Sequence, residues 1–242
     1  MKPTPLFEIA SDIDVAGLAA TFQRDGRVQV PNVLTPETAA TLHRILSTET
    51  EWGLGWGAAE QTGNVRAAAW HAMSPAERAK FGDQARAAAQ RGDFAFLYAR
   101  YPMIEAYLEQ WDPGHPLDLL LEHLNAPLAL DFLRDLTGIL ELIKAEAQAT
   151  LFAPGHFLTS HDDHHAATGR RVAYVLNLAR DWQPDWGAYL SFHNAAGDIK
   201  ASFRPAFNSL NLFAVPQRHS VGFVPPYAPV GRYAITGWYR DQ

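Results

Sequence analysis

From about residue 142 to the end of the chain, short apolar segments alternate with turn residues, and this pattern restricts the fold more than any other feature. The segments Arg171–Leu178, Tyr189–Phe192, Leu210–Ala214 and Tyr233–Tyr239 are rich in β-branched and aromatic side chains. Pro, Gly, Asp and Asn bound them, as expected for strands that end in turns. Several short strands at near-regular spacing predict a jelly-roll or barrel core.

The first part of the chain is predicted to be mostly helical. Ser11 or Asp12 is expected to cap a helix that ends near Gly26. Thr35-Pro36 is typical of a helix start, with a capping hydroxyl followed by proline at the first helical position. Ser74-Pro75-Ala76-Glu77 matches a capping box. Two further short helices are expected over Pro116–Leu124 and Leu128–Leu136.

Together these patterns predict an α+β protein with a mainly β core. Residues 1–141 are expected to form an N-terminal scaffold of helices and short strands, which include a strand at Arg27–Val30. Residues 142–242 are expected to form the core on which this scaffold packs. A chain of 242 residues suits one compact domain made of both parts.

Composition narrows the possible partners and ligands. The chain is 48% hydrophobic, with a formal net charge of -6 and no Lys/Arg cluster, which argues against a nucleic-acid partner. No apolar run approaches the roughly 18 residues that span a bilayer, so no membrane partner is expected. The N-terminal segment has no apolar signal region, and a cytoplasmic location is the default expectation. Without cysteine, a metal site must be built from histidine and carboxylate.

The densest group of such residues is the segment FAPGHFLTSHDDHH at residues 152–165. Residues at i and i+2 project from the same side of an extended strand, so His161 and Asp163 can reach one ion together. His219, in a Pro/Gly-rich stretch after a later strand, is a candidate third ligand. Two imidazoles and one carboxylate that leave positions open are typical of a non-haem Fe(II) oxygenase.

The same segment allows other interpretations. HDDHH is also typical of a solvated loop, and a single distant histidine is more often a structural residue than a ligand. Asp162, His164 and His165 offer rival ligand pairs, including a reversed Asp162/His164 pair. The residues alone leave these alternatives open.

The C-terminal run GRYAITGWYR predicts one strand with Arg232, Ala234, Thr236 and Trp238 on the same face. An arginine that points inward among apolar neighbours is costly unless it meets an anion. The guanidinium fork matches a carboxylate in a bidentate way, which suits the far end of 2-oxoglutarate. A structural pair with Asp or Glu is the alternative.

Taken together, these residues resemble the prolyl 4-hydroxylase-like branch of the 2-oxoglutarate/Fe(II) oxygenases. That branch includes the hypoxia-factor and the ribosomal-protein prolyl hydroxylases. The resemblance covers residues 142–239, and DGRVQVPNVLTPETAATL at residues 25–42 is similar to the N-terminal strand and helix of these enzymes. The segments that carry it are FAPGHFLTSHDD, RRVAYVLNLARDW, WGAYLSF and RYAITGWY.

The resemblance implies a double-stranded β-helix (a jelly-roll, cupin-like fold) flanked by N-terminal helices. It selects His161, Asp163 and His219 as the ligands of Fe(II), and Arg232 as the anchor of 2-oxoglutarate. It also implies oxidative decarboxylation of 2-oxoglutarate to succinate and CO2, with O2 as oxidant and hydroxylation of a substrate C–H. Ascorbate is the expected reductant in vitro.

The sequence departs from the family pattern around the co-substrate. Phe152 stands where many relatives have a tyrosine. Asn177 occupies a strand position at which relatives often have a second tyrosine that contacts the 2-oxoglutarate carboxylate. We expect the Asn177 amide to donate to 2-oxoglutarate instead, assisted by Thr236 or Tyr174. These departures leave the metal ligands intact.

The substrate is less constrained. A helical insert near residues 52–125 is expected to shape the entrance, and its aromatic residues suit a proline ring or an extended peptide. The family favours a prolyl residue in a protein or peptide, with a free amino acid or another small molecule as the alternative. A catalytically silent jelly-roll that binds metal is a third hypothesis, against which Arg232 argues. The sequence does not indicate an oligomeric state.

Overall fold

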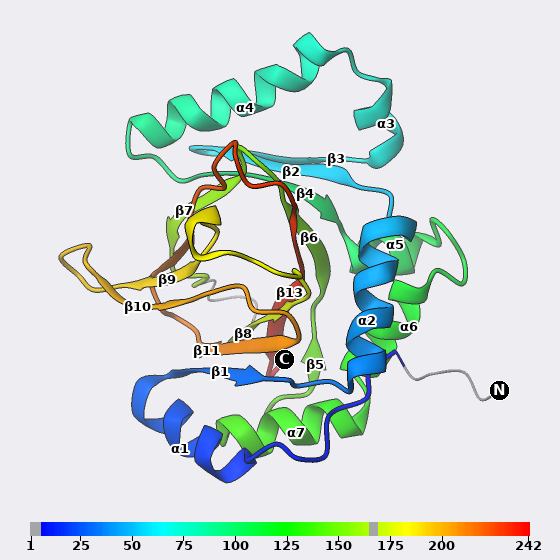
Figure 1. Ribbon diagram of the computed structural model, residues 1–242, viewed down its shortest axis with the longest axis vertical. Coiled ribbons are helices and arrows are strands. Elements are labelled where there is room, and N and C mark those ends of the chain that lie inside the picture. Colours follow the sequence, from blue (N-terminus) through cyan, green and yellow to red (C-terminus); the bar gives the residue numbers. More distant parts are fainter. Residues whose placement is uncertain (1–5, 165–168) are drawn as a thin grey trace.

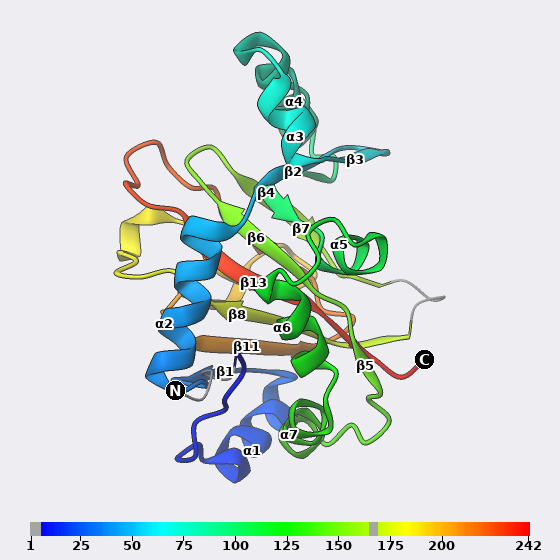
Figure 2. The same ribbon diagram turned by 90° about the vertical axis from the view of Figure 1, so that its right-hand side faces the viewer.

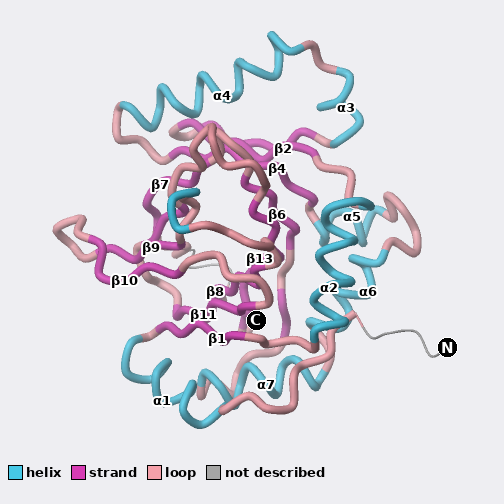
Figure 3. The backbone as a smooth tube through the Cα atoms, in the orientation of Figure 1, coloured by secondary structure: helices cyan, strands magenta, loops and turns pink. Residues whose placement is uncertain are grey.

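The computed structural model describes residues 6–164 and 169–242 of the chain. An antiparallel sheet curls into a nearly closed barrel, and helices cover its outside (Figure 1; Figure 3). This is the mainly β architecture with N-terminal flanking helices that the sequence predicts. Among the helices of the described residues, none is long and apolar enough to cross a membrane.

Thirteen strands join in one sheet in the described part of the chain. They are β1 (Arg27–Pro31), β2 (Gly53–Ala58), β3 (Gln61–Val65), β4 (Ala95–Tyr101), β5 (Lys144–Ala145), β6 (Gln148–Phe152), β7 (Phe157–His161), β8 (Arg170–Asn177), β9 (Leu190–His193), β10 (Ile199–Phe203), β11 (Ser209–Ala214), β12 (His219–Val221) and β13 (Arg232–Arg240). The main order is β1-β11-β8-β13-β6-β4-β7-β12-β9-β10.

This order positions the site. Strands β7 and β12, which carry the candidate histidines, are neighbours. Strand β13, which carries Arg232, lies between β8 and β6. Strand β4 pairs with both β6 and β7. It therefore joins the strands around Arg232 to the strands that carry the candidate histidines.

The helices pack on the outside of this sheet (Figure 2). They are α1 (Val15–Asp25), α2 (Pro36–Arg44), the π-helical turn η1 (Ile45–Glu49), α3 (Ala67–Ala72), α4 (Pro75–Gln90), α5 (Met103–Glu109), α6 (Pro116–Leu124), α7 (Pro127–Thr137) and the 3-10 turn η2 (Pro184–Trp186). Helices α1 and α7 pack against each other beneath β1 (Figure 1). The largest apolar core lies between the helices and the sheet, and each Leu or Phe buried there stabilises the fold by about 1.5–3 kcal/mol.

Most helix boundaries follow the capping signals of the sequence. The Thr35 side chain caps α2, with Pro36 in its first turn. Ser74 and Glu77 form the capping box of α4. The first helix differs from the prediction, because Asp14 caps it rather than Ser11 or Asp12. The carboxylate of Asp14 accepts from the backbone N–H of Gly17, which satisfies one of the free donors of the first turn.

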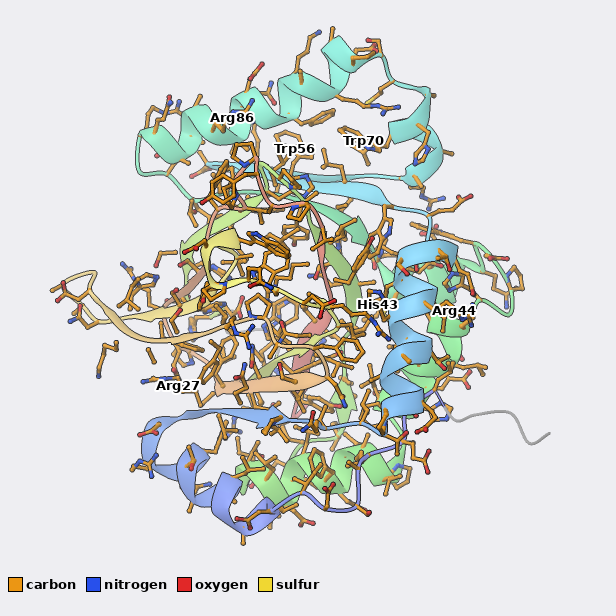
Figure 4. All side chains as sticks on the ribbon, viewed as in Figure 1. Arg27, His43, Arg44, Trp56, Trp70 and Arg86 are labelled. Carbon is orange, nitrogen blue, oxygen red and sulfur yellow. The ribbon has the colours of Figure 1, made fainter. Side chains whose placement is uncertain are left out.

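The sequence predicted a helical insert near residues 52–125, but the segment is not purely helical. It also contributes β2, β3 and β4, which join the main sheet. Helix α4 covers this region, and Figure 4 shows Trp56 and Trp70 between α4 and the strands β2 and β3. Both rings pack edge-on against Phe81 of α4, at centroid distances of 5.3 and 6.1 Å. These contacts hold α4 on the barrel.

Candidate active site

The two candidate histidine ligands face each other across a strand pair. His161 ends β7 and His219 begins β12, and the two are direct partners in the antiparallel register. Nδ1 of His161 lies 3.0 Å from the Thr159 carbonyl, and Nδ1 of His219 lies 2.7 Å from the Gln217 carbonyl. A carbonyl only accepts, so each Nδ1 carries the proton. Each Nε2 therefore keeps a lone pair that a metal can use.

Asp163 places its carboxylate between the two rings. Its backbone adopts a left-handed conformation, with φ of 59°, directly after β7. One carboxylate oxygen lies 3.3 Å from Nε2 of His161, and the other lies 3.5 Å from Nε2 of His219. Burial alone would raise the pKa of Asp163, but its contacts with the two histidines more than offset burial and lower it. The carboxylate is therefore ionised at neutral pH.

These donor atoms fit a divalent transition metal. The three ligand atoms lie within 4.8 Å of one another. Metal–ligand bonds of about 2.1 Å place adjacent donors about 3 Å apart, close to the separations found here. Burial lowers the pKa of His219 to about 4, and the neighbouring His161 adds to this effect, so His219 is a neutral ligand at physiological pH. All three residues line one cavity, and they would supply only three of the coordination positions of a bound metal.

The rival ligand pairs are not assembled in the described residues. Asp162 is exposed, and its carboxylate accepts from the backbone N–H of His164 at 3.0 Å. This contact forms a local turn, and Asp162 does not belong to the group of residues whose donor atoms come together. His165 lies outside the described residues. The structure thus brings together the three residues that the family register selects.

Arg232 lies in the same cavity as these three residues. The cavity has a volume of about 200 Å³. The Arg232 side chain is 2% exposed, and burial lowers its pKa to about 10, so it remains a cation at neutral pH. Its Nη2 donates to Oδ1 of Asn177 at 3.1 Å, and its Nε has no hydrogen-bond partner among the described residues. A buried cation with an unused donor fits a carboxylate.

Two of the other predicted co-substrate residues line this cavity. Thr236 is two register positions beyond Ala234 on β13, and its hydroxyl accepts from Gln148 at 3.3 Å. The Tyr174 hydroxyl donates to the Glu146 carbonyl at 2.9 Å. The Thr236 hydroxyl therefore keeps its own hydrogen for a ligand, whereas the Tyr174 hydroxyl donates its hydrogen to the Glu146 carbonyl and can only accept from a ligand.

Asn177 takes a different place from the one expected of a direct co-substrate donor. It is fully buried, and its amide N–H donates to the carbonyl and the hydroxyl of Ser209 at 3.3 and 3.2 Å. Its carbonyl oxygen accepts from Arg232. In this structure Asn177 holds the guanidinium, and direct donation to 2-oxoglutarate stays a prediction.

Several residues that line the cavity were not predicted from the sequence. A row of aromatic rings runs along one wall, from Phe94 through Phe96 and Tyr98 to Phe152, with centroid separations of 5.6, 5.4 and 5.0 Å; the first pair is tilted and the other two are stacked. The sequence suggested a role for the aromatic residues near residues 52–125, but it did not predict that three of them line up with Phe152. Gln148 and Thr150 also line the cavity and were not singled out. Their period-two spacing with Phe152 on β6 is the signal that identifies this inner face.

Two imidazoles, a carboxylate and a buried guanidinium line one cavity, and this is the set of groups expected in a non-haem Fe(II) oxygenase that uses a carboxylate-bearing co-substrate. Residues 147–240 match the family model of the 2OG-Fe(II) oxygenase superfamily, a range that includes all four side chains. The predicted resemblance to this superfamily is thereby confirmed. Its members require Fe(II), 2-oxoglutarate and O2; the His161/Asp163/His219 donor set fits the metal, and the buried guanidinium of Arg232 fits a carboxylate of 2-oxoglutarate. A search of curated protein sequences found no match.

Several solved structures share this fold. A prolyl-4-hydroxylase from Pseudomonas putida aligns with a TM-score of 0.58 at 19% identity, over 94% of this chain and 99% of that one. A prolyl hydroxylase from Trichoplax adhaerens, in complex with a hypoxia-inducible-factor peptide fragment, gives 0.57 at 16% identity over 94% and 89%. The non-haem α-ketoglutarate-dependent epimerase SnoN from nogalamycin biosynthesis gives 0.54 at 14% identity over 94% and 83%. At these identities the likeness establishes the fold.

Proposed function

We propose that the protein is a 2-oxoglutarate-dependent hydroxylase that acts on a prolyl residue of a polypeptide. In this proposal His161, Asp163 and His219 hold Fe(II), and Arg232 binds the distal carboxylate of 2-oxoglutarate. One observation carries the proposal: the Arg232 guanidinium, whose Nε has no partner among the described residues, and the three candidate ligands line the same cavity of about 200 Å³. A silent metal-binding barrel has no need of a buried carboxylate anchor.

When bound, Fe(II), 2-oxoglutarate and O2 supply the oxidation of a substrate C–H to an alcohol, with succinate and CO2 as co-products. The residues of the chain position these groups. Arg232 fixes the far end of the co-substrate, so that its keto-acid end is directed toward the ligand triad. The Nδ1–H contacts of His161 and His219 hold both rings in the ligating tautomer. The ionised Asp163 supplies the one negative charge of the ligand set.

The aromatic wall of the cavity suits a substrate group that is apolar and ring-shaped. Phe94 is 38% exposed at the outer end of the aromatic row, and its ring centroid lies 5.5 Å from that of His161. Phe96 and Tyr98 continue the row inward. Such rings exclude water and offer flat apolar surfaces against which a pyrrolidine ring can pack. The two prolyl hydroxylases among the structural neighbours support the same substrate class.

A small-molecule substrate is the second candidate. The epimerase SnoN, from nogalamycin biosynthesis, shares this fold. A free amino acid or another small molecule fits a cavity of about 200 Å³ as well as a peptide side chain does.

The test is co-substrate turnover with defined substrates. Purified protein receives Fe(II), ascorbate and 2-oxoglutarate together with a library of proline-containing peptides, and succinate and peptide mass are measured. The proposal requires enzyme-dependent succinate and a mass gain of one oxygen on proline. Arg232→Ala should abolish both, whereas Arg91→Ala, at an exposed position outside the cavity, should change neither. Succinate with small molecules only would favour the second candidate, and succinate at the level of the enzyme-free blank with both substrate sets would overturn both.

A further inference from the structure

A second cavity lies outside the barrel, next to the region where β2 begins and β4 ends. Its volume is about 530 Å³, larger than that of the metal cavity. The segments that border it follow α2, precede α3 and connect α5 to α6, and Figure 2 faces these elements. No residue of the metal triad lines it. The proposed catalysis therefore does not account for this cavity.

The charges around the second cavity do not cancel. Its lining includes the carboxylates of Glu49, Glu51 and Asp112. Glu49 is paired with Arg44, which Figure 4 labels on α2. Glu51 and Asp112 form no ion pair among the described residues.

The cations of the lining already have partners. Arg66 pairs with Glu109, and Arg100 lies 3.6 Å from Glu105. Two carboxylates of the lining are therefore left without a counter-charge. Tyr101, a buried tyrosine in the lining, is affected by these negative charges. Burial is the main reason that its pKa rises to about 12, and the carboxylates of Asp118, Asp112 and Glu51 raise it further.

A buried polar group in the wall of this cavity also lacks a partner. His115 is 6% exposed, and its Nδ1 accepts from the backbone N–H of Leu117 at 3.1 Å. In the neutral ring the proton is therefore on Nε2, which has no hydrogen-bond partner among the described residues. A buried donor without an acceptor is costly. A ligand that brings a carbonyl oxygen removes this cost.

Aromatic side chains complete the cavity. The Tyr101 ring stacks on His115 with 5.2 Å between centroids. The guanidinium of Arg66 lies 4.1 Å from the centroid of Trp111, which shows that this ring accepts a cation. The ligand that matches all of these groups has a cationic side chain, a carbonyl acceptor and an aliphatic stem.

The second cavity adjoins the metal cavity through one contact. Arg100, in the lining of the second cavity, donates from Nε to Gln148, which lines the metal cavity. Arg100 follows Tyr98 by two residues on β4, a separation of about 7 Å along a strand. One strand therefore contributes lining residues to both cavities, two positions apart.

We propose that the second cavity binds a lysine or arginine side chain of the polypeptide substrate, a few residues from the hydroxylated position. Glu51 and Asp112 contact the cationic group, and Nε2–H of His115 donates to a backbone carbonyl of the same segment. The identity of the occupant as part of the substrate rests on the proposed function. The preference for a basic peptide does not depend on turnover.

The test measures peptide binding in the absence of iron. Two fluorophore-labelled, end-blocked peptides serve as probes: Ala-Lys-Ala-Lys-Ala, and the same peptide with norleucine in place of lysine. Fluorescence anisotropy at low salt, in EDTA, should show tighter binding of the lysine peptide. The double variant Glu51→Gln/Asp112→Asn should bind it about threefold more weakly or worse, because each exposed pair contributes modestly. Glu60→Gln, an exposed acid outside the cavity, is the matched control and should bind like the natural protein.

His115→Asn tests the buried donor separately. Asparagine can still cap α6, so the variant should fold, and thermal unfolding checks this. We expect weaker binding of the lysine peptide and of its norleucine counterpart alike, because the lost contact is to the backbone. Equal affinities for the two peptides in the natural protein, or unchanged affinity in the double variant, would overturn the proposal. Since no turnover is measured, this result is independent of the succinate assay.

Discussion

Arg232 and Asn177 are held together by a buried hydrogen bond of 3.1 Å between neighbouring strands β13 and β8. Asn177 is fixed in turn, because its amide N–H donates to Ser209 on β11. Three adjacent strands therefore determine where the guanidinium lies. The arginine keeps its remaining donors for a ligand, and its position is set before the ligand arrives.

Replacing Asn177 should weaken co-substrate binding more than it affects metal binding. In Asn177→Ala the guanidinium loses the Oδ1 acceptor at 3.1 Å, and a hydrogen bond to a charged group contributes about 1.5–3 kcal/mol. We expect the KM for 2-oxoglutarate to rise roughly tenfold or more. Initial rates of succinate formation over a range of 2-oxoglutarate concentrations measure this effect.

Asn177→Asp serves as the contrasting variant. A carboxylate at this position would neutralise Arg232 and compete with the co-substrate, so the KM should rise further than in Asn177→Ala. If both variants kept the natural KM, Arg232 would not be the anchor or Asn177 would not position it. Titration with Co(II), read from its absorption spectrum, should be the same in all three proteins.

Metal affinity should depend on Asp163 and not on its neighbour Asp162. Asp163 provides one of three donor atoms, whereas Asp162 is exposed and belongs to a local turn. Loss of a residue that only orients a ligand costs about 10–100-fold in affinity, so loss of the ligand itself should cost at least about 100-fold. Co(II) titrations of Asp163→Ala and Asp162→Ala compare the two positions. Similar losses in both variants would move the metal site into the loop.

The His161/Asp163 pair could be proposed from the sequence because its geometry is local, and the family resemblance was needed to choose it and to add His219. His161 and Asp163 are two residues apart at a strand end, and His219 follows in the order typical of the family. The Asn177–Arg232 bond could not be found in this way, because it depends on the register between β8 and β13. Sequence patterns specify which residues share a face of a strand. They do not specify which residue of the next strand lies opposite.

The strands β2 and β3 were missed for a different reason. Their sequences, GLGWGA and QTGNV, are rich in glycine and contain few β-branched residues, which weakens the strand signal. Pairing with β4 stabilises β2 in the fold. The second cavity depends on these strands and on the loop between α5 and α6, so it could not be foreseen without them.

Zinc should occupy the candidate centre and block turnover. Zn(II) binds imidazole and carboxylate donors at least as well as Fe(II) does, but it has no redox chemistry. Adding Zn(II) should reduce succinate formation in competition with Fe(II), and EDTA followed by excess Fe(II) should restore it. Activity that persists under saturating Zn(II) would show that these residues do not hold the catalytic metal.

Stability of the metal-free protein should fall as the pH drops below about 6.5, with a contribution from His156. Burial lowers the pKa of His156 in the folded state, and its contact with the Leu151 carbonyl opposes this only in part. Above the unfolded pKa both states are neutral at this ring, so it adds no pH dependence. Below that pH the unfolded state takes up a proton that the folded state does not, until the pH reaches the folded pKa. Stability therefore falls by about 1.4 kcal/mol for each unit of difference between the two pKa values.

Urea unfolding of the natural protein and of His156→Gln, between pH 7.5 and pH 5 (roughly one unit either side of the ordinary histidine pKa) and in EDTA, measures this contribution. Glutamine does not titrate, so the variant should lose less stability over this range, whatever its stability at the upper pH. His219 has a lowered pKa of the same sign and is present in both proteins, so its contribution cancels in the comparison. Identical pH slopes for the two proteins would show that the buried His156 ring is protonated equally in the folded and unfolded states.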